Sequence, residues 1–125
     1  MDIPSELKYT NEHEWLRADG NVAVAGITDY AQGELGDIVF VELPAVGTDV
    51  KAGAPFGTIE AVKAVSDLLS PVSGKIIEIN NDLEDNPTAV NTDPYNEGWM
   101  VKIKMSNPSE MDELLSAEEY QNLVG

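Results

Sequence analysis

Short runs of alternating apolar and polar residues, separated by turn residues, constrain the fold of this chain most strongly. The clearest run is "WMVKIKM", in which the apolar residues 99, 101, 103 and 105 alternate with the lysines Lys102 and Lys104. A side-chain period of two is the pattern of a β-strand with one buried face. The turn "ADGN" between two other runs favours a hairpin, because Gly20 and Asn21 tolerate positive φ. We therefore expect a mainly β chain built from short strands.

The same alternation predicts which residues face the core. It places Val22 and Val24 on one face of "NVAVAGI" and Ile77 and Ile79 on one face of "KIIEI". In "DIVFVEL" it groups Val39, Val41 and Leu43.

Helices are expected only at the margins, near residues 28–35 and 109–124. Thr28 is a good N-cap for "TDYAQGELG", and Gly36 is a good C-terminal stop. In the last segment Ser109 is expected to cap one helix, and "SAEE" from Ser116 matches a capping box for a second. The polar, proline-containing stretch "NPTAVNTDPYNEG" is expected to be an ordered loop without regular structure.

Composition limits what the chain can do chemically. Its 125 residues suit one domain, residues 1–125, and they carry 23 acidic against 7 basic side chains, a formal charge of −16. Such a surface repels nucleic acid and anionic membranes. The chain has no cysteine and one histidine, His13, and it shows no phosphate-binding loop, so we expect no catalytic activity of its own. The first residues, "MDIPSELKYT", lack the layout of a secretory signal or a transit peptide, and we expect a cytoplasmic protein.

One lysine lies in an unusual position. In "IEAVKAVSDLLSPVSGKIIEIN", Lys63 lies between two apolar runs, which are expected to pair as strands over residues 57–62 and 64–69. Lys63 would then project from a hairpin tip between the small, uncharged Val62 and Ala64. Such an exposed amine can serve as an attachment point, but a lysine at a hairpin tip can also be an ordinary solvated charge.

The chain resembles the H-protein family of the glycine cleavage system over essentially its full length. The matching stretches are "KYTNEHEW", "GITDYAQGELGDIVFVELPAVG", "IEAVKAVSDLLSPVSG" and "NTDPYNEGWMVKIKM". The resemblance implies a single lipoyl-carrier domain, a monomer, with the lipoyl-domain-like barrel-sandwich hybrid of two antiparallel sheets. The chain departs from the family at Ala61, where serine is usual, and at Val65, where a small residue is usual.

The resemblance also implies roles for five residues. Lys63 matches the lysine that carries lipoic acid as a covalent lipoyl-lysine. Glu60 and Gly74 match positions that lipoylating enzymes need. Glu14 and Asp67 match carboxylates that line the cleft where the loaded arm rests. No metal site is expected.

The implied function is that of a shuttle. It would carry the aminomethyl group of glycine from the pyridoxal-phosphate-dependent glycine decarboxylase to the tetrahydrofolate-dependent aminomethyltransferase. Dihydrolipoamide dehydrogenase would then reoxidise the lipoyl group, and a lipoylating enzyme would have attached it.

Three other interpretations stay open from the residues. A biotinyl domain would be expected to have methionines beside its lysine, where this chain has Val62 and Ala64. A lipoyl relay to 2-oxoacid dehydrogenases could use the same residues. An unmodified acidic protein-interaction module would leave Lys63 as a surface charge.

Overall fold

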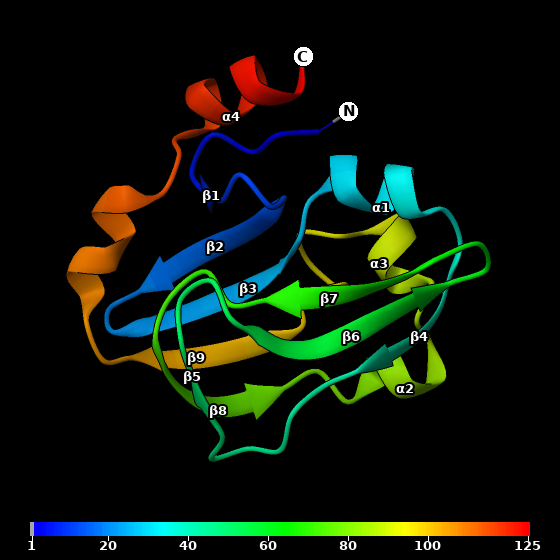
Figure 1. Ribbon diagram of the computed structural model, residues 1–125, viewed down its shortest axis with the longest axis horizontal. Coiled ribbons are helices and arrows are strands. Elements are labelled where there is room, and N and C mark those ends of the chain that lie inside the picture. Colours follow the sequence, from blue (N-terminus) through cyan, green and yellow to red (C-terminus); the bar gives the residue numbers. More distant parts are fainter. Residues whose placement is uncertain (1) are drawn as a thin grey trace.

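The computed structural model describes residues 2–125, which form two antiparallel sheets with short helices at the margins (Figure 1). The larger sheet has the strand order β1-β2-β3-β9-β8-β5 and comprises Lys8–Tyr9, Glu14–Asp19, Val22–Ile27, Val101–Met105, Gly74–Ile79 and Asp49–Val50. The smaller sheet has the order β4-β6-β7 and comprises Ile38–Glu42, Pro55–Ala61 and Val65–Leu69. The prediction of a mainly β chain with two antiparallel sheets and peripheral helices is confirmed.

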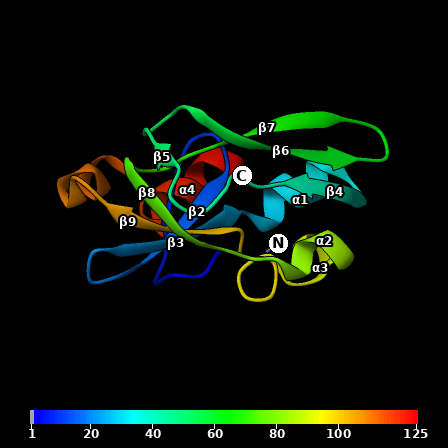
Figure 2. The same cartoon turned by 90° about the horizontal axis from the view of Figure 1, so that it is seen from below.

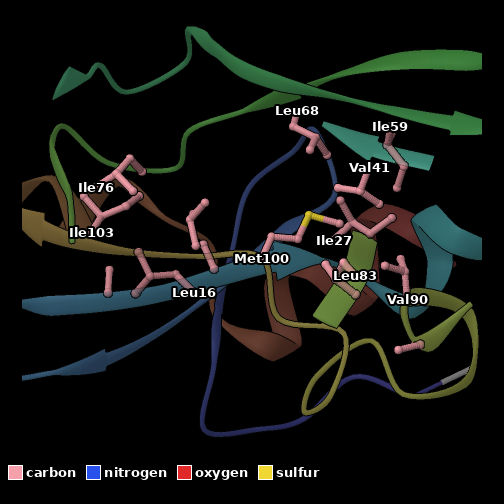
Figure 3. Close-up of a cluster of buried hydrophobic side chains, with 14 of the residues drawn as sticks. Leu16, Ile27, Val41, Ile59, Leu68, Ile76, Leu83, Val90, Met100 and Ile103 are labelled. Atoms are coloured by element: carbon pink, nitrogen blue, oxygen red, sulfur yellow. The ribbon is translucent and has the colours of Figure 1, made fainter. Parts of the chain in front are cut away.

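The main core lies between the two sheets. Figure 2 shows the small sheet above the large one, and Figure 3 shows Leu68, Val41 and Ile59 pointing from the small sheet toward Met100 and Ile27. All five are at most 5% exposed. A second buried cluster, around Trp15, Tyr9 and Tyr120, lies on the other face of the large sheet. Strand β3 is therefore buried on both faces, with Val24 in the second cluster and Ile27 in the first.

Two β-bulges overturn part of the predicted facing. The register of β8 against β9 shifts between Ile76 and Glu78, so Ile76 is fully buried and Ile77 is 41% exposed. The register of β4 against β6 shifts between Ile38 and Phe40, and Val39 is 48% exposed. A bulge inserts one residue and reverses the alternation beyond it. The prediction for "WMVKIKM" is confirmed for residues 101, 103 and 105, which are buried in the main core. It was wrong for Trp99, which is partly buried against the second cluster, while its neighbour Met100 is fully buried in the main core.

Three of the four predicted helix caps are confirmed, and one was wrong. Helix α1 (Asp29–Leu35) begins after Thr28, whose hydroxyl accepts a hydrogen bond from the Ala31 amide, and it ends at Gly36 with φ of 84°. Helix α4 (Ala117–Val124) has the predicted capping box of Ser116 and Glu119. The prediction for Ser109 was wrong: the 3-10 helix η1 (Pro108–Glu113) follows Asn107, and Ser109 lies inside it.

Two one-turn helices lie in the region of 81–93. Helix α2 spans Asp82–Asp85 and helix α3 spans Ala89–Thr92. The expectation that "NPTAVNTDPYNEG" has no regular element was therefore wrong for its central part. The turns are held by burial of Leu83, Ala89 and Val90 rather than by helical periodicity, which four residues are too few to show. Among residues 2–125, no helix combines the length and apolar character needed to span a membrane.

Candidate functional site

Lys63 lies at the tip of the β6–β7 hairpin, which extends to the right in Figure 1. Two backbone hydrogen bonds fix this tip. The Ala61 amide donates to the Ala64 carbonyl at 2.7 Å, and the Val62 amide donates to the Asp37 carbonyl at 3.0 Å. The second bond joins the tip to the segment between α1 and β4. The tip is thus held at its base and from one side, although its side chains are exposed.

The Lys63 amine is exposed and has no acidic partner within the described residues. The salt bridges found in residues 2–125 are Lys75–Asp49 and Lys102–Glu78. The aliphatic part of Lys63 lies over Gly36: a Cβ atom placed on Gly36 would be 3.3 Å from Lys63 Cε. The end of the lysine side chain therefore lies beside the C-terminal end of α1.

The side chain of Asn91 in α3 holds the segment that contacts the tip. Its Oδ1 accepts a hydrogen bond from the Ile38 amide at 2.9 Å, and its Nδ2 donates to the Gly36 carbonyl and to Gln32 Oε1, each at 2.9 Å. Three groups on α1 and β4 are thus fixed by one amide. No sequence motif marked Asn91, because its partners lie more than 50 positions away.

A cavity of about 330 Å³ lies next to the end of α1. Its wall is formed by residues 12–14 with Ile27, by α1 from Tyr30 to Leu35, and by Ile59 with residues 66–68 of the small sheet. Leu35 in this wall directly precedes Gly36, over which Lys63 lies. Three hollows are larger. Two of them, of about 480 and 690 Å³, adjoin Arg17 and contain none of the five predicted site residues, and the third, of about 410 Å³, is lined by Gly74.

Glu14 is the buried acid of this cavity. It is 7% exposed, and Thr10 Oγ1 donates to its Oε1 at 2.6 Å. Burial raises the pKa of Glu14 to about 7, against the opposing effect of the Thr10 hydrogen bond. The Glu12 carboxylate adds to the rise. Glu14 is thus poised between its neutral and charged forms near neutral pH.

His13 lies beside Glu14 in the same wall with an uncommon positive φ of 70°. Its Nδ1 is hydrogen-bonded to Tyr120 Oη at 2.9 Å, and that hydroxyl also pairs with Thr28 Oγ1 at 2.7 Å. Burial lowers the pKa of His13, while Glu12 and Glu34 act in the opposite direction. The sequence favoured a structural histidine; the structure places it both in this network and at the cavity.

Asp67 also lines the cavity, but its neighbour Ser66 faces it more directly. The strand register pairs Ser66 with the buried Ile59, and it pairs Asp67 with Thr58. Opposite residues of a strand pair share a face, so Asp67 belongs to the outer face and borders the cavity at its rim. Alternation counted from Ile59 could have identified Ser66.

Glu60 and Gly74, the two predicted recognition residues, lie far apart in the fold. Glu60 is exposed in β6, three residues before Lys63. Gly74 begins β8, which starts on the left of Figure 1, whereas the hairpin tip lies on the right. A Cβ atom at Gly74 would be 2.1 Å from the Lys104 carbonyl oxygen, so close strand packing already requires glycine there.

The cavity combines an apolar floor with acidic groups. Ile27, Leu35, Ile59 and Leu68 supply the apolar part, and Glu12, Glu14, Glu34 and Asp67 supply the carboxyl groups. None of the described residues in its wall is lysine or arginine. Such a lining suits an apolar chain that ends in a cationic group.

The chain is similar to known proteins along nearly its whole length. The family model described as "Glycine cleavage H-protein" matches residues 7–125. Proteins named "Glycine cleavage system H protein" from Carboxydothermus hydrogenoformans and Staphylococcus haemolyticus are each 55% identical to it, over 122 and 125 residues. These alignments cover 98% and 100% of this chain and 94% and 99% of the relatives.

A solved structure agrees with the fold. The crystal structure of a glycine cleavage system H protein from Mycobacterium marinum matches with a TM-score of 0.88 and 42% identity, covering 96% of this chain and 97% of that one. This likeness supports the predicted barrel-sandwich architecture of lipoyl-domain type, built here from two open sheets. With a full-length family match, close relatives and this shared fold, the chain belongs to the glycine cleavage H-protein family.

Proposed function

We propose that this protein is the lipoyl-bearing shuttle of a glycine cleavage system and that Lys63 is the residue that carries lipoic acid. One observation supports the assignment most strongly. An exposed amine without an acidic partner among the described residues stands at a fixed hairpin tip, beside the wall of an acid-lined cavity. A free amine is what amide formation requires, and a nearby cavity is what a returning arm requires.

The residues present fit a lipoyl group. The Lys63 side chain already lies over Gly36, next to the wall residue Leu35. The apolar side chains Ile59 and Leu68 suit a hydrocarbon arm, which would continue from the lysine into the cavity. When bound, the lipoyl group supplies a disulfide–dithiol pair, which a chain without cysteine lacks.

Glu14 would hold the amine cargo. A cation that enters the cavity favours the charged form of a neighbouring carboxyl, so it lowers the pKa of Glu14 from about 7 and ionises it. The ionised group then accepts a charge-assisted hydrogen bond, and Thr10 keeps its carboxylate oriented. The buried setting excludes water, which would otherwise attack the cargo.

The role of Glu14 can be tested separately. Replacing Glu14 with alanine should speed hydrolysis of the methylamine-loaded protein, because the ammonium group loses its partner in the cavity. An unchanged hydrolysis rate would remove Glu14 from the mechanism.

The partners follow from the same proposal. The shuttle would serve a glycine decarboxylase, an aminomethyltransferase and dihydrolipoamide dehydrogenase, and it would not catalyse a step itself. The single domain, the monomeric state, the cytoplasmic location and the recognition roles of Glu60 and Gly74 stay predictions of this proposal.

Intact mass is the direct test of attachment. The purified chain is incubated with a lipoate-attaching enzyme, ATP and lipoate, and its mass should rise by one lipoyl group. Lys63→Arg is the matched control and should stay unmodified, because its guanidinium cannot form the amide. Modified protein should then restore glycine decarboxylation in the reconstituted system. An unmodified natural chain, or equal modification of the Lys63→Arg variant, would contradict the proposal.

A further inference from the structure

Exposed apolar side chains gather on the sheet that carries Lys63. Among residues 2–125, seven large hydrophobic side chains are exposed, and four of them belong to β4 or the β6–β7 hairpin: Val39 at 48%, Phe40 at 47%, Val62 at 76% and Val65 at 66%. Single exposed apolar residues are normal on protein surfaces, but a group of them in one place marks an interaction site.

The strand register makes part of this group contiguous. Phe40 pairs with Glu60, and Glu60 pairs with Val65, so these residues form one row across the three strands. Directly opposite residues share a face, and Val62 follows on that face two positions after Glu60. Figure 2 shows no helix or strand over this outer face of β6 and β7.

Acidic residues border the apolar row. The adjacent row of the same face contains Glu42, Thr58 and Asp67, again from the three strands in register. In these two rows of the outer face, no residue is lysine or arginine. A partner that fits this surface has an apolar centre flanked by lysine or arginine side chains.

We infer that this face, defined by Phe40, Glu60, Val62 and Val65 and bordered by Glu42 and Asp67, docks the enzyme that attaches lipoate to Lys63. The inference rests on the proposed function. Before attachment, the Lys63 amine reaches only about 6 Å from its Cα atom, by ordinary bond lengths. The attaching enzyme must therefore bring its active site to the tip and lie against the neighbouring sheet face. Enzymes that use the finished arm can act from further away.

The test compares attachment kinetics of matched variants. The double variant Phe40→Ser, Val65→Thr removes the aromatic ring and replaces a methyl group with a hydroxyl group. It should lower kcat/KM for attachment about tenfold, mainly through a higher KM, because side chains at an interface centre dominate binding. Ile77→Ser is the control, since Ile77 is 41% exposed on a strand of the other sheet. The control should stay within about twofold of the natural chain, as expected for a surface site outside the interface.

A second measurement changes the charge at one exposed position, where substitution should not affect folding. Val65 is exposed on β7, an edge strand, so Val65→Lys and Val65→Glu should both fold. If the partner surface is basic, it repels the added lysine, so Val65→Lys should have a lower kcat/KM for attachment than Val65→Glu. Added salt should reduce this difference in kcat/KM, because it screens the charges. Thermal unfolding checks that the variants compared are equally folded.

Two results would count against the inference. If the Phe40→Ser, Val65→Thr double variant is modified as well as Ile77→Ser, this face does not dock the attaching enzyme, although lipoyl attachment itself would stand. If the natural chain is not modified at all, both the proposed function and the docking surface fall.

Discussion

Glu14 shows how burial sets the chemistry of one residue. Its side chain is nearly inaccessible yet lines two cavities, and its pKa is raised to about 7. Between the ordinary pKa of a glutamic acid and 7, the native state binds more protons than the unfolded state. Native stability must therefore fall as the pH rises through this window.

Replacing Glu14 with glutamine should raise the free energy of unfolding at about pH 8 by at most about 3 kcal/mol, because glutamine never becomes charged. The gain should shrink toward about pH 5, where Glu14 is already largely neutral in the native state. Urea unfolding across this range measures both values. Glu97→Gln, at an exposed position, is the control. A gain that does not change with pH would contradict the raised pKa.

Gly74 has a packing role in the sheet that does not depend on the proposed recognition by a lipoylating enzyme. A Gly74→Ala variant should lose about 3 kcal/mol of stability, because the new Cβ overlaps the Lys104 carbonyl oxygen and two strands must move apart. Gly33→Ala in α1 is the control, because the same substitution there should stabilise the protein. No atom lies within 4 Å of its Cβ position, so alanine should stabilise the helix by about 0.5–1 kcal/mol. Chemical denaturation of both variants measures the contrast, and equal effects would contradict it.

At the scale of elements, Asn91 connects α3, α1 and β4 and so supports the hairpin tip. Asn91→Ala should cost about 2–3 kcal/mol, since it leaves the Ile38 amide and the Gly36 carbonyl without their partner. It should also speed hydrogen exchange of the Val62 amide beyond the effect of lower global stability, because that amide is bound to the Asp37 carbonyl. Exchange followed by NMR measures this.

Asn91→Asp is the matched variant. It keeps an oxygen for the Ile38 amide but places a second oxygen against the Gly36 carbonyl. We expect a loss similar to that of the alanine variant. Unchanged Val62 exchange in both variants, after correction for global stability, would show that the tip does not depend on Asn91.

At the scale of the whole molecule, the charge of −16 is balanced by few ion pairs. The salt bridges within residues 2–125 are two pairs, each with an N–O distance of 3.4 Å, of which Lys75–Asp49 is exposed and Lys102–Glu78 is partly buried at its lysine. Repulsion between carboxylates should therefore outweigh attraction. The thermal midpoint should rise when sodium chloride is increased from about 0.01 to 0.2 M, since screening weakens repulsion at these distances. A midpoint that falls with salt, measured by circular dichroism, would contradict this.

Local signals in the sequence predicted much of this molecule. The strand over 101–105, the hairpin around Lys63, the caps Thr28 and Gly36 and the capping box at Ser116 each depend on neighbours within a few residues. The faces of Ile77 and Val39 were wrong because a bulge depends on pairing with a distant strand, which alternation within one strand does not record.

The cavity was the least predictable part. Its wall joins residues 12–14, the helix from Tyr30 and strand residues 66–68, which only the tertiary fold brings together. The resemblance to the family supplied Glu14 and Asp67, but His13, Ser66 and Asn91 have roles that depend on contacts across the fold. Short-range patterns carry no information about such contacts.

The hydrogen bond from the Val62 amide to the Asp37 carbonyl has a mechanical consequence. The residues that end α1 also bind the hairpin tip, so under the proposed function the anchor of the lipoyl arm and one wall of its cavity would be coupled. Displacing the tip would then displace that wall as well, and the distance that the arm must span would change little. The return of the arm to the cavity would therefore need no hinge.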